Sequence, residues 1–354
     1  MDPEVSILLP VYNAEQTLET CLRSLLRQRM DAWECVLVDD GSGDRSLELA
    51  RGIARHDPRI RVFEVEHRGL VESLNFGLER CRAPIVARMD ADDWMHRDRL
   101  GLQLRALCDE PQLAAVGTHV RIFPREALAT QRKAAAKERA LPGETSRVRK
   151  GRGGYEAWLN SITSADDVAR EAFVECPIAH PTLAIRTDVL EAHRYRDMGW
   201  PEDYDLVLRL LAAGHALAVV PRRLLAWRDH ESRLSRTSPR YTLERFVDCK
   251  ALHLSLTLLR GRSDYILWGY GSTGRMLARA LAKLGLTPSH IVELHPRRIG
   301  QQIFGATVIH PTGLASIGVG PLVASVAGAG PRQEIRLALS KLGYLEGRDF
   351  VCAA

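Results

Sequence analysis

Apolar runs and amphipathic segments alternate along the first 120 residues of the chain. The apolar runs have the length of strands: VSILLP, ECVLVDD, IRVFEV, PIVARMD and LAAVGTHVRIF. The segments between them carry apolar residues at three- and four-residue spacing, as helices do: 14–28, 44–56, 69–81 and 99–109. Strands that are apolar throughout are buried on both faces. The pattern therefore predicts an α/β fold, with a parallel sheet covered by helices on both faces.

The pattern stops over residues 121–152, where ten basic and three acidic residues gather. Such a composition is typical of a solvated excursion, in which one exposed helix over 126–140 is expected. The alternative is a basic lid or a contact with the membrane edge, which would attract an anionic acceptor. The pattern then resumes with AHPTLAIRTDVL and with a helix over 203–213, which Gly214 ends.

A second unit begins near residue 262. DYILWGYGSTGRMLARALAKLGL predicts a strand, a glycine turn and a helix, and HIVEL predicts the next strand. The turn reads Gly269-x-Gly271-x-x-Gly274, and Glu293 follows Gly274 by nineteen residues. In this context the glycines let a pyrophosphate approach a helix N-terminus, and the acid holds a ribose. The motif thus predicts a second nucleotide site.

At 354 residues the chain exceeds the usual size of one domain. We therefore predict two domains, 1–262 and a small Rossmann-like α/β domain over 263–354. The second domain, at about ninety residues, has room for one mononucleotide-sized half of the dinucleotide-binding fold. A packing or regulatory module without turnover is thus the alternative to nucleotide binding.

Composition excludes several classes of protein. A net charge of +5 is too small to imply a nucleic-acid partner. The seven cysteines form no Cys-x-x-Cys pair, which argues against a zinc site and against a disulfide framework. No apolar run reaches eighteen residues, and no basic region precedes the first apolar run. These features predict a cytoplasmic protein without a signal peptide or a membrane span.

Acidic residues gather where predicted strands end. Asp90-x-Asp92 follows PIVARM, and two carboxylates at a strand end can hold a hard divalent cation such as Mg²⁺ or Mn²⁺. A solvated surface turn is the alternative explanation of this short motif. Asp39 ends another strand, where it can accept hydrogen bonds from a base or a ribose; an Asp-Gly turn is its alternative.

A third acidic cluster opens the helix predicted over 203–213. Glu202, Asp203 and Asp205 fall in its first turn, where negative side chains favour the positive end of the helix dipole. A carboxylate there can also act as a general base on an acceptor hydroxyl. The residue types alone leave both roles open.

Six motifs in this order resemble the family 2 glycosyltransferases over about residues 4 to 250: PVYNAEQTLETCLRSLLRQ, VDDGSGD, ARMDADD, HPTLAIRTDVL, WPEDYDLVLRL and WRDHESRLSR. The resemblance implies a GT-A fold, which is a nucleotide-binding mixed sheet flanked by helices. It also implies that a sugar moves, with inversion, from a nucleotide diphosphate-sugar, commonly UDP-linked, to a hydroxyl acceptor. We expect a saccharide or lipid-linked saccharide acceptor of cell-envelope or exopolysaccharide synthesis. The enzyme would then act in the cytoplasm or at the inner face of the membrane, with 121–152 as its peripheral contact.

The resemblance also implies roles for the matched residues. The donor nucleotide is expected to meet Pro10, Val11, Tyr12, Asn13, Asp39 and Asp90. Asp92 and His230 would hold Mn²⁺ or Mg²⁺, and Asp203 would be the catalytic base. His180 and Glu202 are assigned to the acceptor side; His180 can instead end a strand, and His230 can be a hydrogen-bonded loop histidine.

Two other function classes compete with the transferase. One is an NAD-dependent sugar oxidoreductase that uses the C-terminal glycines, and it leaves VDDGSGD and DADD unexplained. The other is a protein that binds nucleotide sugars without transfer. Only a turnover measurement separates this last class from the transferase.

Overall fold

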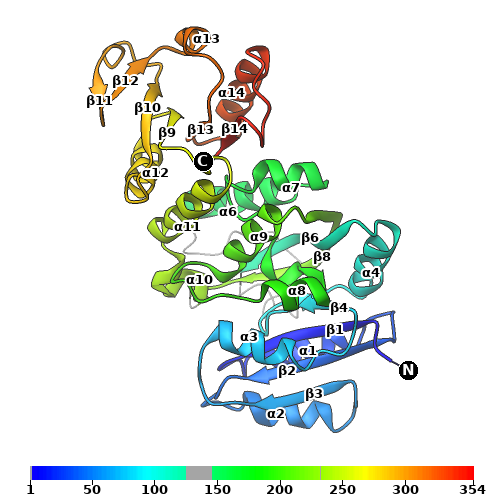
Figure 1. Cartoon of the computed structure of the whole chain (residues 1–354). Coiled ribbons are helices and arrows are strands. Elements are labelled where there is room, and N and C mark those ends of the chain that lie inside the picture. The colour runs from blue at the N-terminus through cyan, green and yellow to red at the C-terminus, as the bar shows by residue number, and fades with distance from the viewer. Residues whose placement is uncertain (1, 125–145, 232) are drawn as a thin grey trace. The chain divides into compact units, whose positions relative to one another are not determined.

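The computed structural model of the chain describes residues 2–124, 146–231 and 233–354 (Figure 1). The helix predicted over 126–140 lies outside the described residues, as does most of the basic segment 121–152. The chain divides into two compact units that interleave along the sequence. Unit 1 comprises Met1–Val168, Pro177–Asp197 and Gly214–Thr237, and unit 2 comprises Ala169–Cys176, Met198–Ala213 and Ser238–Ala354. The domain boundary predicted at residue 262 stays a prediction.

Unit 1 is built on a mixed sheet, in which eight strands of the described chain follow the order β3-β2-β1-β4-β7-β6-β8-β5. The strands are β1 (Val5–Val11), β2 (Trp33–Asp39), β3 (Ile60–Glu64), β4 (Ile85–Arg88), β5 (Trp94–Met95), β6 (Leu113–Pro124), β7 (Ala184–Arg186) and β8 (Ala216–Asp229). Neighbours from β3 to β4 are parallel, whereas β7 runs antiparallel to both β4 and β6. β6 and β8 are parallel, and β5 is antiparallel to β8.

All five strands predicted in the first 120 residues are present, but the sheet is not parallel throughout. The mixed sheet implied by the family resemblance is confirmed; the parallel sheet predicted from the apolar runs is present from β3 to β4, but it does not extend to β7 and β5. The apolar pattern could not separate the two, because a strand buried on both faces is apolar whichever way its neighbour runs.

Helices cover both faces of the first strands. The helices of this part are α1 (Leu18–Leu25), α2 (Ser46–Ala54), α3 (Leu70–Leu78), α4 (Arg99–Asp109), α6 (Ser146–Leu159), α7 (Ala165–Glu171, which crosses into unit 2), α8 (Thr187–His193) and α10 (Leu234–Thr237), with a 3₁₀ turn at His180–Thr182. Ile7 and Leu9 of β1 share one core with Leu22 of α1. Leu8 points to the other face, where a Cβ on Gly77 of α3 would lie only 2.4 Å from its Cδ1. The side-chain alternation of β1 thus supplies both helix layers.

Unit 2 holds a smaller sheet of order β11-β12-β10-β9-β13-β14. Its strands are β9 (Asp264–Trp268), β10 (Thr287–Val292), β11 (Gln302–Ile303), β12 (Ala306–Ile309), β13 (Leu322–Ala324) and β14 (Phe350–Cys352). Its helices are α9 (Glu202–Ala212), α11 (Leu243–Leu256), α12 (Ser272–Ala282), α13 (Leu314–Ile317) and α14 (Ala329–Lys341), with 3₁₀ turns at Pro239–Tyr241 and Pro311–Gly313. Leu267 of β9 shares a core with α11 and α12, and Trp268 shares another with α14. The smaller sheet is therefore covered on both faces.

Two sequence predictions for unit 2 are confirmed. β9, a glycine turn and α12 follow one another as DYILWGYGSTG predicted, and β10 comes next. α9 begins at Glu202, and Gly214 after its end has the left-handed φ of 85°. Among the described residues, no helix combines the length and the apolar character that a membrane crossing needs.

Candidate active site

The carboxyl ends of β1 and β2 lie beside each other in unit 1, with Val11 paired to Asp39. Asp39 is 1% exposed; its Oδ1 accepts a hydrogen bond from the backbone N–H of Ser42 at 3.0 Å. Its Oδ2 is buried and has no partner among the described residues. A buried carboxylate oxygen without a donor is costly, so this oxygen is available to an N–H or O–H group of a ligand. A base or a ribose has such a group.

An aromatic platform lies at the same edge of the sheet. Tyr12 follows β1 and is 50% exposed, and its ring stacks on His67 with centroids 4.2 Å apart and planes inclined by 21°. His67 Nδ1 lies 2.9 Å from Oδ2 of Asp40, which follows β2. Asn13 adopts a left-handed φ of 50°, and its Oδ1 accepts a hydrogen bond from the N–H of Gly43 at 2.9 Å. The loops after β1, β2 and β3 are thereby fixed to one another.

The sequence did not predict His67. It lies in a loop after β3 with no motif around it, and it reaches Tyr12 only because the strand order places β3 next to β2 and β2 next to β1. Gly41 permits the approach, since a Cβ there would be 2.9 Å from the backbone nitrogen of His67.

The two predicted metal ligands meet in the structure. Nε2 of His230, directly after β8, lies 2.9 Å from Oδ2 of Asp92. The antiparallel pairing of β5 with β8 explains the meeting, because it places Trp94 opposite Ala226. One carboxylate oxygen from each of Asp90, Asp92 and Asp93 lies within 4.8 Å of the others. The three carboxylates are thus close enough to share one cation, while the assignment of Asp92 and His230 as the metal ligands stays a prediction.

The pKa values of Asp92 and Asp93 are shifted in opposite directions. Burial and the nearby charges of Asp92 and Asp90 raise the pKa of Asp93 well above its usual range, and its Oδ1 accepts a hydrogen bond from the N–H of Arg228 at 2.8 Å. Burial also acts to raise the pKa of Asp92, but the hydrogen bond with His230 and the positive charge of Arg233 outweigh it, and the pKa is lowered. Asp92 is therefore anionic, while Asp93 accepts a hydrogen bond from the backbone.

Asp90 has a different partner. Its carboxylate forms an ion pair with the guanidinium of Arg88, the last residue of β4. Arg88 is almost wholly buried, whereas 27% of the Asp90 side chain is exposed. The buried guanidinium of Arg88 therefore fixes the position of Asp90, while part of the Asp90 side chain stays exposed.

In unit 2, Glu202 and Asp203 open α9 as predicted. Burial, followed by the charges of Glu202 and Glu175, raises the pKa of Asp203 to about 8. Asp203 Oδ1 accepts a hydrogen bond from the N–H of Tyr204 at 2.8 Å, and Glu202 Oε2 accepts one from Tyr241 Oη at 2.7 Å. A carboxylate with this pKa is a proton acceptor matched to an alcohol better than an ordinary aspartate is.

Asp205 serves the structure instead. Its Oδ2 accepts a hydrogen bond from Arg209 Nε at 2.7 Å, and its Oδ1 lies 3.1 Å from His253 Nε2 and 3.3 Å from Trp200 Nε1. Both oxygens of this buried carboxylate are therefore engaged, which fastens α9 to α11. Cys249 completes a buried Asp-Cys-His cluster, but the arginine on the carboxylate opposes a cation there.

His180 lies in the 3₁₀ turn before β7 and is 8% exposed. Its Nε2 lies 3.0 Å from Oη of Tyr195. Burial and the charge of Arg88 lower the pKa of His180 well below its usual range, so the ring is neutral. The hydrogen bond gives His180 a structural partner, and its place on the acceptor side stays a prediction.

The C-terminal glycine turn has the expected backbone. Gly269 has a φ of +93°, and a Cβ on Gly274 would lie 2.1 Å from the carbonyl oxygen of Gly269, so only glycine fits there. Gly271 directly precedes α12. Glu293, the residue expected to hold a ribose, pairs with Arg298 at 3.1 Å. The second nucleotide site stays a prediction, and its acid already has a partner within the chain.

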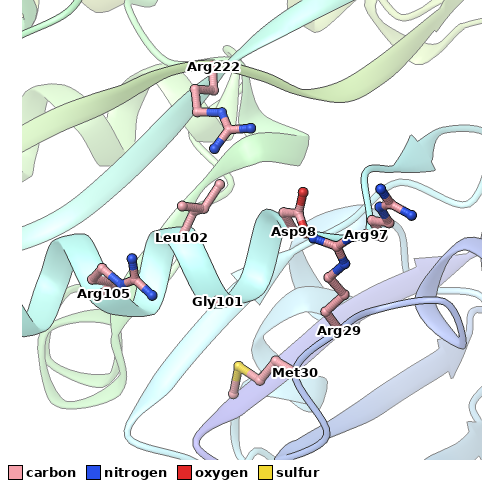
Figure 2. Close-up of a pocket in the computed structure, with 8 residues that line it drawn as sticks. All are labelled: Arg29, Met30, Arg97, Asp98, Gly101, Leu102, Arg105 and Arg222. Atoms are coloured by element: carbon pink, nitrogen blue, oxygen red, sulfur yellow. Dashed lines mark ion pairs between the residues drawn. The ribbon is translucent and has the colours of Figure 1, made fainter.

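A separate cavity of about 360 Å³ opens on unit 1 (Figure 2). Four arginines belong to its lining, Arg29, Arg97, Arg105 and Arg222, and Figure 2 shows Arg29 and Arg97 beside Asp98. Asp98 Oδ1 pairs with Arg29 at 3.0 Å, which leaves an excess of positive charge in the lining. The predicted site residues do not line this cavity.

The chain resembles known glycosyltransferases in sequence and in fold. The family model described as glycosyl transferase family 2 matches residues 6–190. The amylovoran biosynthesis glycosyltransferase AmsE of Erwinia amylovora is 32% identical over 224 residues, which cover 62% of this chain and 74% of AmsE. EpsH of Bacillus subtilis (strain 168) is 41% identical over 111 residues, which cover 31% of this chain and only 32% of EpsH.

The crystal structure of S. aureus TarS 1-349 in complex with UDP-GlcNAc has the same fold. Its TM-score is 0.52 at 16% sequence identity, and the match covers 79% of this chain and 72% of that chain. This likeness shows the fold, and the family match over more than half of the sequence shows the class of the protein. The chain belongs to glycosyl transferase family 2.

Proposed function

We propose that this glycosyltransferase moves a sugar from a nucleotide diphosphate-sugar to a hydroxyl group of a saccharide or lipid-linked saccharide, with inversion at the anomeric carbon. The observation that carries the proposal is the pair of Asp92 and His230, 2.9 Å apart in the unit whose strand β2 ends at Asp39. AmsE, by its name, serves amylovoran biosynthesis, which supports a role in exopolysaccharide or cell-envelope synthesis. UDP-GlcNAc is the first donor to test, because TarS was crystallised with it.

The donor nucleotide is assigned to the loops that follow β1 and β2. Asp39 Oδ2, which has no partner among the described residues, would accept a hydrogen bond from the base. The exposed ring of Tyr12, backed by His67, would stack on the base, and Pro10, Val11 and Asn13 would line the same pocket. Asp90 would accept a hydrogen bond from the ribose.

The residues at the diphosphate end fit a divalent cation. Asp92 is anionic, its partner His230 has a nitrogen lone pair to offer, and carboxylate oxygens are the donors that Mg²⁺ and Mn²⁺ favour. Among the two, Mn²⁺ tolerates the imidazole better. The bound cation would supply charge neutralisation of the diphosphate leaving group.

Asp203 is the proposed base. Inversion needs one displacement, in which the acceptor oxygen bonds to the anomeric carbon while the bond to the diphosphate oxygen breaks. The hydroxyl proton passes to the Asp203 carboxylate, and the bonding electron pair leaves with the diphosphate. No second catalytic carboxylate is required, unlike in glycoside hydrolysis. Glu202 and His180 are assigned to the acceptor side.

We further propose that the enzyme acts in the cytoplasm at the inner face of the membrane. The basic segment 121–152 would make the peripheral contact, because ten basic residues attract anionic headgroups. Vesicle sedimentation with and without anionic phospholipid measures this contact. Equal sedimentation with neutral and anionic vesicles would remove it from the proposal.

The reaction is tested with a panel of nucleotide sugars, Mn²⁺ and saccharide acceptors, by following release of the nucleoside diphosphate. The wild type is expected to turn over one donor, and Asp203→Asn is expected to bind that donor with unchanged affinity and to lose turnover. Asp264→Asn, at the exposed start of β9, is the matched control. Unchanged turnover in Asp203→Asn would remove the base. Donor binding without turnover by the wild type would favour a binding protein.

A further inference from the structure

Segment 169–176 lies against the first turn of α9 in unit 2. Tyr204, which follows Asp203, is fully buried, and its Oη donates a hydrogen bond to the carbonyl oxygen of Ala172 at 2.7 Å. Glu175 of the same segment adds negative charge near Asp203 and near Tyr204. The place of this segment therefore decides both the position and the surroundings of the first turn of α9.

A buried lysine joins the same segment to the smaller sheet. Lys250 of α11 is 6% exposed, and its Nζ donates hydrogen bonds to the carbonyl oxygens of Val174 at 2.7 Å and Ala353 at 3.1 Å. Ala353 follows β14, and its N–H donates to the carbonyl oxygen of Ala324, the last residue of β13. Burial lowers the pKa of Lys250 to about 8, so at neutral pH one ammonium connects segment 169–176 with the carboxyl ends of two strands.

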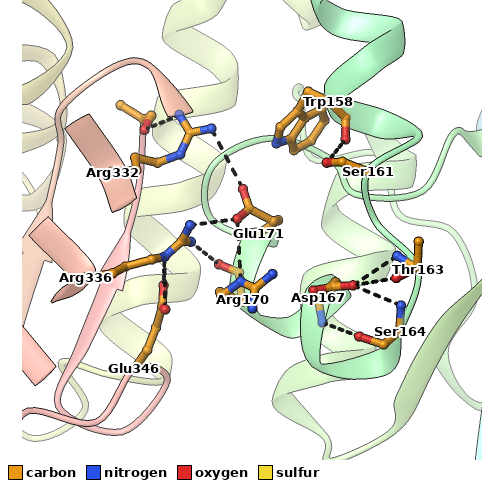
Figure 3. Close-up of polar contacts among 11 residues, drawn as sticks. Trp158, Ser161, Thr163, Ser164, Asp167, Arg170, Glu171, Arg332, Arg336 and Glu346 are labelled. Carbon is orange, nitrogen blue, oxygen red and sulfur yellow. Dashed lines mark hydrogen bonds and ion pairs between the residues drawn. The ribbon is translucent and has the colours of Figure 1, made fainter. Parts of the chain in front are cut away.

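Two arginines of α14 make a second connection. Figure 3 shows Arg332 and Arg336 turned toward Glu171. Arg336 Nη1 lies 2.9 Å from Glu171 Oε1, and its Nε lies 2.9 and 3.0 Å from the two carboxylate oxygens of Glu346. Arg332 Nη2 lies 3.9 Å from Glu171 Oε2. The Arg336 and Glu171 side chains are 14% and 10% exposed, so water screens this pair less than a surface pair.

From these contacts we propose that the C-terminal module, residues 263–354, positions the first turn of α9 and with it Asp203. Lys250 and Arg336 are the positioning residues, and segment 169–176 is the part through which they act. The proposal rests on the role of base proposed above for Asp203. This positioning role of the module does not require a nucleotide to bind at the glycine turn.

The chemistry of the contacts supports positioning over simple packing. Burying an ammonium and two guanidinium groups costs desolvation that an apolar contact of similar size would avoid. Hydrogen bonds and ion pairs, however, fix direction and register in a way that apolar contacts do not. A shift of about 1 Å at a reacting group can lower a rate by about a hundredfold, so such fixing matters at a base.

Charged and titratable groups from three parts of the chain surround Asp203, and a substitution at each of them tests a different influence on its pKa. Glu202 belongs to α9 itself, Glu175 to segment 169–176, and Cys249 to α11. Of these, only Glu175 depends on the contacts made by the module. Glu175→Gln is therefore expected to move the acid limb of the pH profile to lower pH, which a change in folding stability alone would not do.

The test compares Lys250→Met and Arg336→Met with Lys283→Met and Arg279→Met, two exposed positions at α12 that serve as matched controls. Hydrogen–deuterium exchange is measured for peptides covering 171–176 and 201–206. In Lys250→Met and Arg336→Met, these two peptides are expected to exchange about tenfold faster than in the controls. Exchange in the rest of the small sheet is expected to stay unchanged. Their kcat is expected to fall between about 10- and 100-fold, with donor KM within about twofold of the wild type.

Arg336→Lys, which keeps a cation, and Lys250→Arg are expected to recover part of kcat. Should Lys250→Met fail to fold, Arg336→Met and Glu175→Gln carry the same test through exchange and the pH profile. Unchanged exchange at 201–206 and unchanged kcat in a folded Arg336→Met would overturn the proposal. If the wild type shows no turnover but the variants still exchange faster than their controls, the transferase mechanism is contradicted and the positioning of α9 stays supported.

Discussion

The raised pKa of Asp203 predicts how activity depends on pH. Burial and the charges of Glu202 and Glu175 raise this pKa to about 8. A base acts in its ionised form, so with a pKa of about 8 only about 10% of Asp203 is active at pH 7, against about 90% at pH 9. The value of kcat/KM is therefore expected to rise about ninefold from pH 6 to pH 7, and about tenfold from pH 7 to pH 9.

Glu202→Gln probes the cause of this shift. The substitution removes one of the two negative charges that raise the pKa of Asp203, and it keeps an oxygen that can accept the hydrogen bond from Tyr241 Oη. The acid limb is expected to move to lower pH, so that the ratio of kcat/KM at pH 6.5 to that at pH 9 increases. Glu244→Gln, an exposed position in the first turn of α11, is the matched control.

The assay is continuous release of the nucleoside diphosphate between pH 6 and pH 9, at fixed ionic strength and with saturating Mn²⁺. The position of the acid limb in the pH profile of kcat/KM reports the pKa of Asp203. It thereby separates a change in this pKa from a loss of acceptor binding in Glu202→Gln. A profile that is flat over this range, or an acid limb that stays in place in Glu202→Gln, would refute the role of Asp203 as the titrating base.

Two further predictions follow from close contacts in unit 1. Gly77→Ala is expected to lower the free energy of unfolding by about 1–3 kcal/mol, because its Cβ would lie 2.4 Å from Leu8 Cδ1. Urea unfolding measures the loss, and Gly52→Ala, which meets nothing within 4 Å, should not show it. His67→Ala is expected to weaken donor binding by about 0.5–1.5 kcal/mol in calorimetry, because Tyr12 loses the ring stacked against it. An unchanged donor affinity would show that the platform does not hold the base.

Local patterns were sufficient for much of the fold. The strands of the first 120 residues and α9 appear where alternating apolar runs and helical spacing put them. The prediction of a helix over 14–28 was too long, since α1 begins only at Leu18. The N–H of Ala14 donates instead to Oγ of Ser46 at 2.7 Å, a contact between residues far apart in the sequence. Short-range propensity contains no information on such a partner.

Only those residues of the candidate site that lie within a family motif could be predicted from the sequence. Asp92 and His230 are 138 positions apart, and only the order of the family motifs suggested that they meet. His67 has no motif around it, and Lys250 reads as an ordinary helix lysine. Their contacts arise from strand order and from the packing of segment 169–176 within unit 2, which local patterns do not determine.

A crystal structure of the protein grown with UDP and Mn²⁺, with data collected at the manganese absorption edge, tests the donor site most directly. We predict one anomalous peak coordinated by Asp92 and His230, next to the diphosphate, with the uracil held by Asp39. The peak should be missing from crystals of Asp92→Ala grown in the same way. A peak that is bound by neither Asp92 nor His230, or a uridine placed away from Asp39, would contradict the account.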